Sequence, residues 1–237
     1  MWFFIYHNMS KDFTVLQKKL GLSFNDPSLL EQAFVHRSYL NENRSFPLDH
    51  NERLEFLGDA VLELVVTEYL YLEYQNPEGE LTNWRASLVN AKILSKITRG
   101  LGVEEYLYLS KGESKDTGKA REYILANVFE SLTGAIYLDQ GFEAAKKFIY
   151  TNVLVELPEI LENKSYLDPK TKFQEAAQEK VGVTPVYKVL SESGPDHDKI
   201  FEIGVYLKKD LIASGNGSSK QEAQEAAALA GLEKMDW

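Results

Sequence analysis

The spacing of apolar residues changes once along this chain of 237 residues, near residue 168. Before that point apolar positions recur at helical intervals, and no run alternates in the way that a half-buried strand does. After it, a helical segment precedes three strand-like runs and an alanine-rich helix. The sequence therefore predicts an all-α domain at residues 11–158, a linker at 159–168, and a small α+β domain at 169–237.

Turn-forming residues divide both parts into predicted elements. In the first part, helical spacing is found in five segments: 28–42, 51–75, 80–99, 120–138 and 142–156. The second part is predicted to have the order α-β-β-β-α, with elements at 170–181, 185–192, 200–207, 211–214 and 220–234. Ser218 or Ser219 is expected to be the N-cap of the last helix.

Composition limits the classes of function. The chain has no cysteine, which excludes disulfides and thiolate metal sites and is typical of a protein of the reducing cytoplasm. No apolar run approaches the ~20 residues of a membrane-spanning helix, so no membrane partner is expected. The net charge of −10 argues against a nucleic-acid binder, unless its positive side chains are gathered locally.

The most distinctive stretch of the first part runs from His50 to Glu63. On a helix, three of its apolar residues and the residue that follows the stretch share a side: Leu54, Leu57, Val61 and Leu64. Acidic residues crowd a narrow arc of the other side: Glu52, Glu55, Asp59 and Glu63. Such like charges repel, so either the face is simply solvated or a cation such as Mg²⁺ lies on it. Phe56 projects beside the acids, which favours contact with a second protein surface.

A second polar helical face lies between Ile124 and Asp139. Asn127, Glu130 and Gly134 share this face, and the opposite face is apolar: Leu125, Val128, Leu132 and Ile136. Gly134 would permit close approach of another backbone or of a ligand. Alone, this pattern is common to many exposed helices.

Together these stretches resemble the ribonuclease III family. Residues 50–63 resemble its signature sequence and 124–139 its second acidic helix, with further similarity at 34–39, 78–82 and 85–89. The resemblance covers residues 11–237. It implies an all-α endonuclease domain that forms a homodimer and cuts double-stranded RNA with Mg²⁺, for which Mn²⁺ can substitute. The expected products carry 5′-phosphate and 3′-hydroxyl ends, as in the processing of structured RNA precursors.

The resemblance also assigns roles to single residues. The expected metal-site and catalytic residues are Glu55, Asp59, Asn127 and Glu130. Glu52 would be a further catalytic residue beside them, and Glu78 would support the catalytic valley. Phe56 would anchor the dimer by filling a socket on the other subunit.

At one position the chain departs from the family pattern, which usually has Asp where Asn127 stands. An amide oxygen can ligate Mg²⁺, but it is neutral and cannot accept a proton from water. Three interpretations stay open: a natural variant in which Asn127 still ligates, an engineered substitution that slows cleavage, and a natural protein that binds RNA but cuts poorly. The alternative to an active enzyme is therefore a double-stranded RNA-binding protein with weakened or lost nuclease activity.

The second part resembles the double-stranded RNA-binding domain. The resemblance implies RNA contacts by residues of the first helix, the loop after the first strand, and the start of the last helix: Gln174, Glu175, His197, Ser218, Ser219, Lys220 and Gln221. The family commonly has a second lysine where Gln221 stands. From Asp168 onward acids number 12 and bases 9, so binding is expected to rest on a local positive patch and on the shape of A-form RNA.

Overall fold

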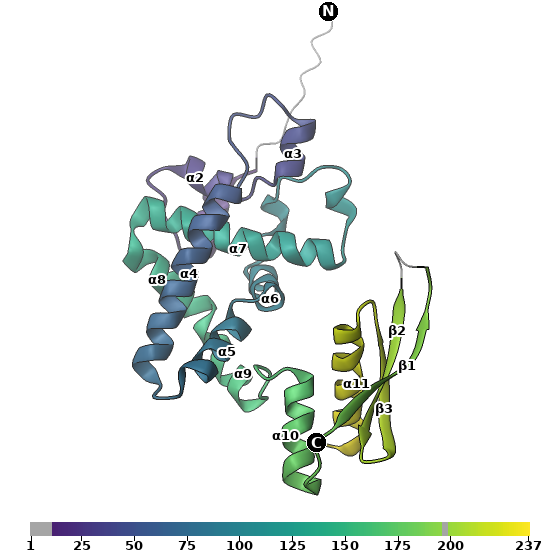
Figure 1. Ribbon diagram of the computed structural model, residues 1–237. Coiled ribbons are helices and arrows are strands. Elements are labelled where there is room, and N and C mark those ends of the chain that lie inside the picture. Colours follow the sequence, from purple (N-terminus) through teal and green to yellow (C-terminus); the bar gives the residue numbers. More distant parts are fainter. Residues whose placement is uncertain (1–10, 196–198) are drawn as a thin grey trace, which may run out of the picture. The chain divides into compact units, whose positions relative to one another are not determined.

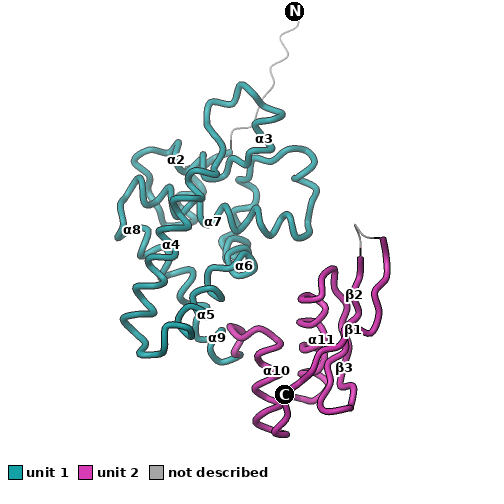
Figure 2. Tube along the Cα trace, in the orientation of Figure 1, with its two compact units in different colours: residues 1–163 teal, residues 164–237 magenta. Residues whose placement is uncertain are grey.

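The computed structural model describes residues 11–195 and 199–237 and divides the chain into two compact units, which meet between Asn163 and Lys164 (Figure 2). The predicted all-α domain followed by a small α-β-β-β-α domain is confirmed (Figure 1). Within the described residues, no helix is both long and apolar enough to cross a membrane.

Unit 1 is built from helices. Its α-helices are α1 (Phe13–Leu20), α2 (Pro27–Gln32), α3 (Arg37–Glu42), α4 (Glu52–Glu73), α5 (Glu78–Leu88), α6 (Ala91–Leu101), α7 (Lys119–Gln140), α8 (Phe142–Asn152) and α9 (Leu157–Glu162). Three short 3₁₀ turns lie between them: η1 (Glu104–Tyr106), η2 (Glu113–Lys115) and η3 (Leu154–Glu156). An isolated parallel bridge joins Val35 to Tyr108.

Helix α7 forms the centre of unit 1. It packs against α2, α4, α6 and α8, and Figure 1 shows α4 crossing it. Leu125, Phe129 and Ile136 of α7 are fully buried. Because α7 is surrounded in this way, it holds the polar side chains of its one open face at fixed positions.

Some predicted helix limits are wrong. The segments 28–42 and 80–99 are each two helices, since residues 33–36 leave the helical conformation to place buried Val35 beside Tyr108, and Asn90 caps a new helix by accepting a hydrogen bond from the Ile93 N–H. The segment 142–156 ends as a helix at Asn152. Apolar spacing continues through the first and last of these breaks because residues between the helices, such as Val35 and Leu154, are buried too.

Unit 2 begins with α10 (Pro169–Val181) and ends with α11 (Lys220–Met235). Between them lies an antiparallel sheet in the order β1-β2-β3, formed by β1 (Val186–Ser193), β2 (Ile200–Leu207) and β3 (Asp210–Gly217). Ser219 is the N-cap of α11, and its hydroxyl oxygen accepts a hydrogen bond from the Glu222 N–H at 3.1 Å.

The core of unit 2 lies between its helices and one face of the sheet. Phe173 of α10, Val205 of β2 and Ala227 of α11 are fully buried there. Helix α11 approaches β3 closely, because a Cβ at Gly215 would lie 2.2 Å from the backbone nitrogen of Ala227. The predicted limits of both domains stay a prediction. Helix α9 extends to Glu162, within the segment predicted as the linker, and its residue Ile160 is buried.

Candidate active site

A contact between two glycines brings α4 and α7 together. A Cβ at Gly58 would lie only 1.7 Å from the backbone oxygen of Glu130, and a Cβ at Gly134 would lie 2.3 Å from the backbone oxygen of Leu54. Such distances leave no room for a side chain, so the two backbones touch. The contact places the acidic face of α4 directly beside the polar face of α7.

Hydrogen bonds fix the start of α4 relative to its neighbours. The side chain of buried Asn51 donates to the Ala33 oxygen at 3.1 Å, and its backbone N–H donates to the Val35 oxygen at 2.9 Å. On α7, the hydroxyl of Ser131 donates to the Asn127 oxygen at 2.6 Å and lies 3.4 Å from the Asn51 oxygen. The first turn of α4, which carries Glu55, is therefore positioned from three sides.

Glu55, Asp59, Asn127 and Glu130 come together at this crossing. Burial, and after it the charges of Asp59 and Glu55, together raise the pKa of Glu130 to about 8. Burial also raises the pKa of Glu55, with Glu52 and Asp59 adding to the effect, while a hydrogen bond from Asn127 lowers it. The pKa of Asp59 is raised by burial and then by Glu63. These carboxyl groups share one half-buried space.

Glu52 lies at the edge of this group and has basic partners. One carboxylate oxygen is 3.3 Å from Nη1 of Arg37, and the other is 3.7 Å from Nδ1 of His50. Both basic residues belong to stretches that were singled out in the sequence, but neither was predicted to act at the site. These contacts give Glu52 surroundings that differ from those of Glu55, which is hydrogen-bonded to Asn127.

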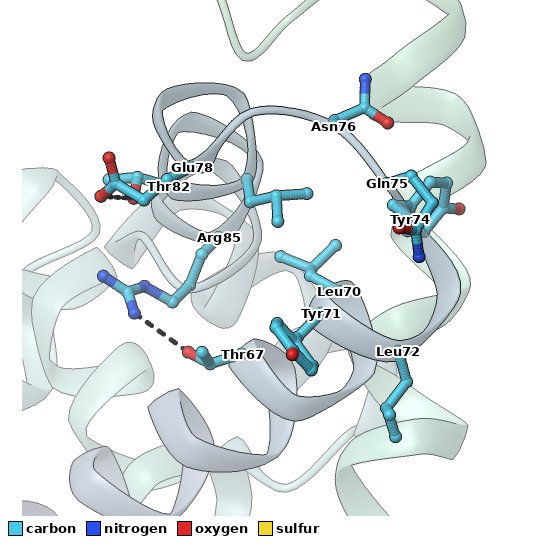
Figure 3. Close-up of a pocket in the computed structure, with 11 residues that line it drawn as sticks. Thr67, Leu70, Tyr71, Leu72, Tyr74, Gln75, Asn76, Glu78, Thr82 and Arg85 are labelled. Carbon is cyan, nitrogen blue, oxygen red and sulfur yellow. Dashed lines mark hydrogen bonds between the residues drawn. The ribbon is translucent and has the colours of Figure 1, made fainter.

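Glu78 lies at the start of α5, away from the acids of the crossing. It is not among the charges that raise the pKa of Glu55, Asp59 or Glu130. Its carboxylate accepts a hydrogen bond from the Thr82 hydroxyl at 3.2 Å, on the rim of a pocket of about 620 Å³ between the end of α4 and α5 (Figure 3). A role in the catalytic valley stays a prediction.

Phe56 projects from α4 into solvent, with 81% of its surface exposed. Leu64 is 57% exposed, although the sequence pattern placed it on the apolar side of the helix with buried Leu54 and Val61. Tyr71, one turn from the end of α4, is 73% exposed and lines the pocket of Figure 3. An apolar stripe thus runs along α4 from the acids to the pocket.

The donors at the crossing fit a divalent cation in chemistry and charge. All are oxygen donors of the kind that Mg²⁺ prefers, and a cation would relieve the repulsion between Glu55, Asp59 and Glu130. Within residues 11–195 and 199–237, no three acidic, histidine or cysteine side chains already form a cage around one point. Mg²⁺ commonly completes its coordination with waters and substrate phosphates beside the protein carboxylates.

In unit 2 the predicted RNA-contact residues lie on α10 and at the start of α11. Gln174 and Glu175 are exposed on α10, and Lys220 and Gln221 are exposed in the first turn of α11. His197 lies outside the described residues. The predicted contacts among the described residues therefore come from two helices that pack against each other.

Comparison with known proteins decides the family. Residues 26–157 match the family described as ribonuclease-III-like, and residues 169–235 match the double-stranded RNA binding motif. The chain belongs to the ribonuclease III family. It is an endoribonuclease of this type, and it carries a domain for double-stranded RNA.

Curated relatives align over nearly the whole chain. Ribonuclease 3 of Protochlamydia amoebophila is 45% identical over 93% of this chain and 91% of its own length. Ribonuclease 3 of Streptococcus gordonii is 44% identical over 95% and 97%. The solved nuclease domain of ribonuclease III from Campylobacter jejuni is 38% identical, covers 62% of this chain and 99% of its own, and superposes with a TM-score of 0.56.

Two features of this ribonuclease III domain were missed from the sequence. Gly58 interrupts a long helical pattern, and an unexplained glycine in a helix interior is a signal of close packing. Arg37 lies within the helix predicted at 28–42, and only the fold shows that it pairs with Glu52. The close approach predicted for Gly134 is confirmed.

Proposed function

We propose that this ribonuclease III is a Mg²⁺-dependent endonuclease that cuts double-stranded RNA and leaves 5′-phosphate and 3′-hydroxyl ends, with Mn²⁺ able to substitute. The observation that carries the proposal is the meeting of Glu55, Asp59 and Glu130 at the crossing of α4 and α7. Asp59 and Glu55 both raise the pKa of Glu130, and such crowding of carboxyl groups is costly unless a cation joins them. Processing of structured RNA precursors is the proposed task.

Each residue at the crossing has a chemical part. Glu55, Asp59, Asn127 and Glu130 would hold the ion through their side-chain oxygens. When bound, Mg²⁺ supplies positive charge that stabilises the phosphoryl transition state and lowers the pKa of water. Carboxylates such as Asp59 and Glu130 can accept a proton from the attacking water, which the Asn127 amide cannot do. Attack of water at phosphorus breaks the bond to the 3′ oxygen, so the phosphate stays on the 5′ end of the product.

A metal titration with a labelled RNA duplex tests the function. The chain is incubated with the duplex over a range of Mg²⁺ and Mn²⁺ concentrations, and cleavage and binding are both measured. We expect cuts that depend on the metal and products that a 5′-phosphate-dependent exonuclease degrades. Binding without cuts at any metal concentration would instead establish the alternative, an RNA-binding protein with lost nuclease activity, which Asn127 favours.

Asn127→Asp tests the consequence of the missing carboxylate. We expect the variant to reach half-maximal cleavage at a Mg²⁺ concentration about tenfold lower, equivalent to about 1.4 kcal/mol of added binding free energy. The added charge attracts the ion and removes the hydrogen bond that Asn127 donates to Glu55. Asn152→Asp on α8 changes the same residue type away from the crossing and serves as the control. Equal titration curves for the wild type and Asn127→Asp would contradict this account.

We also propose that the chain forms a homodimer through the apolar stripe of α4. In a two-fold arrangement with antiparallel α4 helices, Phe56 of one copy faces the other end of α4 in its partner, where the pocket is lined by Leu70, Tyr71 and Leu81. This pocket is the proposed socket. The related domain from Campylobacter jejuni is described with a region involved in dimer formation.

Phe56→Asp should convert the dimer to a monomer, because a charge in an apolar socket loses the buried contact and its own hydration. Analytical ultracentrifugation at micromolar concentration measures the change. Leu138→Asp alters a half-exposed apolar residue of α7 and should leave the mass unchanged. A Phe56→Asp protein that sediments as the wild type does would exclude this interface.

In unit 2 we propose that Gln174, Glu175, Ser218, Ser219, Lys220 and Gln221 contact the RNA duplex, together with His197. The exposure of the described members and the double-stranded RNA binding motif support this. The cytoplasm, inferred from the cysteine-free sequence, stays a prediction.

A further inference from the structure

A carboxylate of the sheet holds the lysine at the start of α11. Nζ of Lys220 lies 3.4 Å from Oε1 of Glu192 and 5.5 Å from the centre of the Phe201 ring. The other oxygen of the same carboxylate, Oε2, lies 3.8 Å from Nζ of Lys199, which directly precedes β2. One acidic side chain therefore bridges two of the lysines of unit 2.

The register of the sheet explains this position. Glu192 of β1 stands opposite Phe201 of β2, and Phe201 stands opposite Gly217 at the end of β3. Helix α11 begins shortly after Gly217, so its first residue, Lys220, returns to the same row of the sheet. The fold therefore brings together two residues, Glu192 and Lys220, that are distant in the sequence.

A second carboxylate occupies hydrogen-bond donors of the loop before α11. Oε2 of Glu222 accepts from the backbone N–H of Ser218 at 2.9 Å and from its hydroxyl at 2.6 Å. A carboxylate offers the same kind of anionic oxygen as a phosphate. Donors and a cation that are predicted to hold RNA phosphates are therefore engaged by acids of the protein itself.

We propose that Glu192 competes with the RNA backbone for Lys220 and Lys199. In the free protein it neutralises the two lysines, and a duplex binds by replacing its carboxylate with phosphates. The inference rests on the proposed function, since it requires unit 2 to bind duplex RNA through the start of α11. Glu192 is the residue to test, because the Glu222 side chain also accepts from the Ser218 N–H just before α11, and its loss would weaken the start of the helix.

The competition is weak enough for RNA to overcome. The side chains of Glu192 and Lys220 are 39% and 58% exposed, and ion pairs in such surroundings are easily exchanged. Removing Glu192 should therefore tighten duplex binding by about two- to fivefold. It should also steepen the salt dependence, because in the wild type the displaced carboxylate takes up cations and offsets part of the counterion release from the RNA.

The experiment compares the full-length wild type with Glu192→Gln. Fluorescence anisotropy measures the affinity for a labelled RNA duplex of about 20 base pairs, longer than the ~16 that one such domain spans. EDTA prevents cleavage, and the salt concentration is varied. Glu202→Gln makes the same change of charge on the neighbouring strand, where the carboxylate accepts from the Ser191 hydroxyl at 3.0 Å. We expect a gain in affinity and slope for Glu192→Gln that clearly exceeds that of Glu202→Gln.

Lys220→Gln completes a double-mutant cycle. If Glu192 acts through this lysine, most of the gain from Glu192→Gln disappears in the Lys220→Gln background. An equal gain in both backgrounds, or equal gains from Glu192→Gln and Glu202→Gln, would show a general charge effect and overturn the inference. If the wild type binds the duplex and Glu192→Gln binds it no more tightly, the inference is wrong but the proposed function stands. If neither protein binds the duplex, the proposed function fails with it.

Discussion

A Glu130→Gln variant will bind duplex RNA and fail to cut it, with a rate about a hundredfold or more below that of the wild type at any Mg²⁺ concentration. Glu130 is the most buried acid of the crossing, as its raised pKa of about 8 indicates. The substitution keeps its shape but removes a charged ligand, and loss of several kcal/mol of transition-state stabilisation corresponds to this fall in rate. Single-turnover cleavage of a labelled duplex measures it.

The same variant provides its own test of folding. Without metal, burial holds the pKa of Glu130 at about 8 in the folded protein, above its ordinary value of 4.5. Between these pH values the folded protein binds a proton that the unfolded chain releases, so stability falls as pH rises. Glu130→Gln has no such proton, and in EDTA we expect it to match the wild type below pH 4.5 and to melt higher at pH 8. Cleavage by a variant that melts in this way would contradict the assigned role.

Gly58→Ala will unfold unit 1 at a temperature about 10 °C lower. The new Cβ would lie 1.7 Å from the backbone oxygen of Glu130 and 2.8 Å from the backbone nitrogen of Gly134, so α4 and α7 must separate. Overpacking of this kind costs about 3 kcal/mol, and a domain of this size loses ~2–4 °C per kcal/mol. Because the acids are carried by these two helices, we expect the cleavage rate to fall even at temperatures where the variant is still folded. Calorimetry and the cleavage assay measure the two effects.

Gly100→Ala is the matched control. Gly100 lies on the exposed side of α6, and a Cβ there would meet no atom within 4 Å. The same substitution should therefore stabilise the protein by about 0.5 kcal/mol, since alanine loses less conformational freedom in a helix. If both substitutions had the same effect, the contact between α4 and α7 would not be as close as described.

Periodicity predicted the parts of the site that depend on one helix. The acidic arc of α4 and the exposed position of Phe56 follow from helical spacing alone, because successive turns bring those side chains to one face. The apolar side of α4 was predicted less well. Leu64 is exposed because the neighbouring helices, and not the hydropathy of a residue, decide which side of α4 is covered.

Features that depend on contact between two elements could not be predicted from the sequence. The meeting of Glu55 with Glu130 needs the crossing of α4 and α7, and Gly134 predicted a close approach without naming its partner. The bridge from Glu192 to Lys220 needs the register of three strands. The break before α3 needs the pairing of Val35 with Tyr108. Local patterns carry no information about such distant partners.

The contact between Gly58 and Gly134 has a consequence for how such a site can change over time. Backbone atoms form the contact between the two helices, and the side chains of the acids take no part in it. A side chain at the crossing can therefore be exchanged for another without rebuilding the core, as the proposed Asn127→Asp variant would do. The choice of ion and the speed of the enzyme are then properties that single substitutions can alter in a scaffold that stays the same.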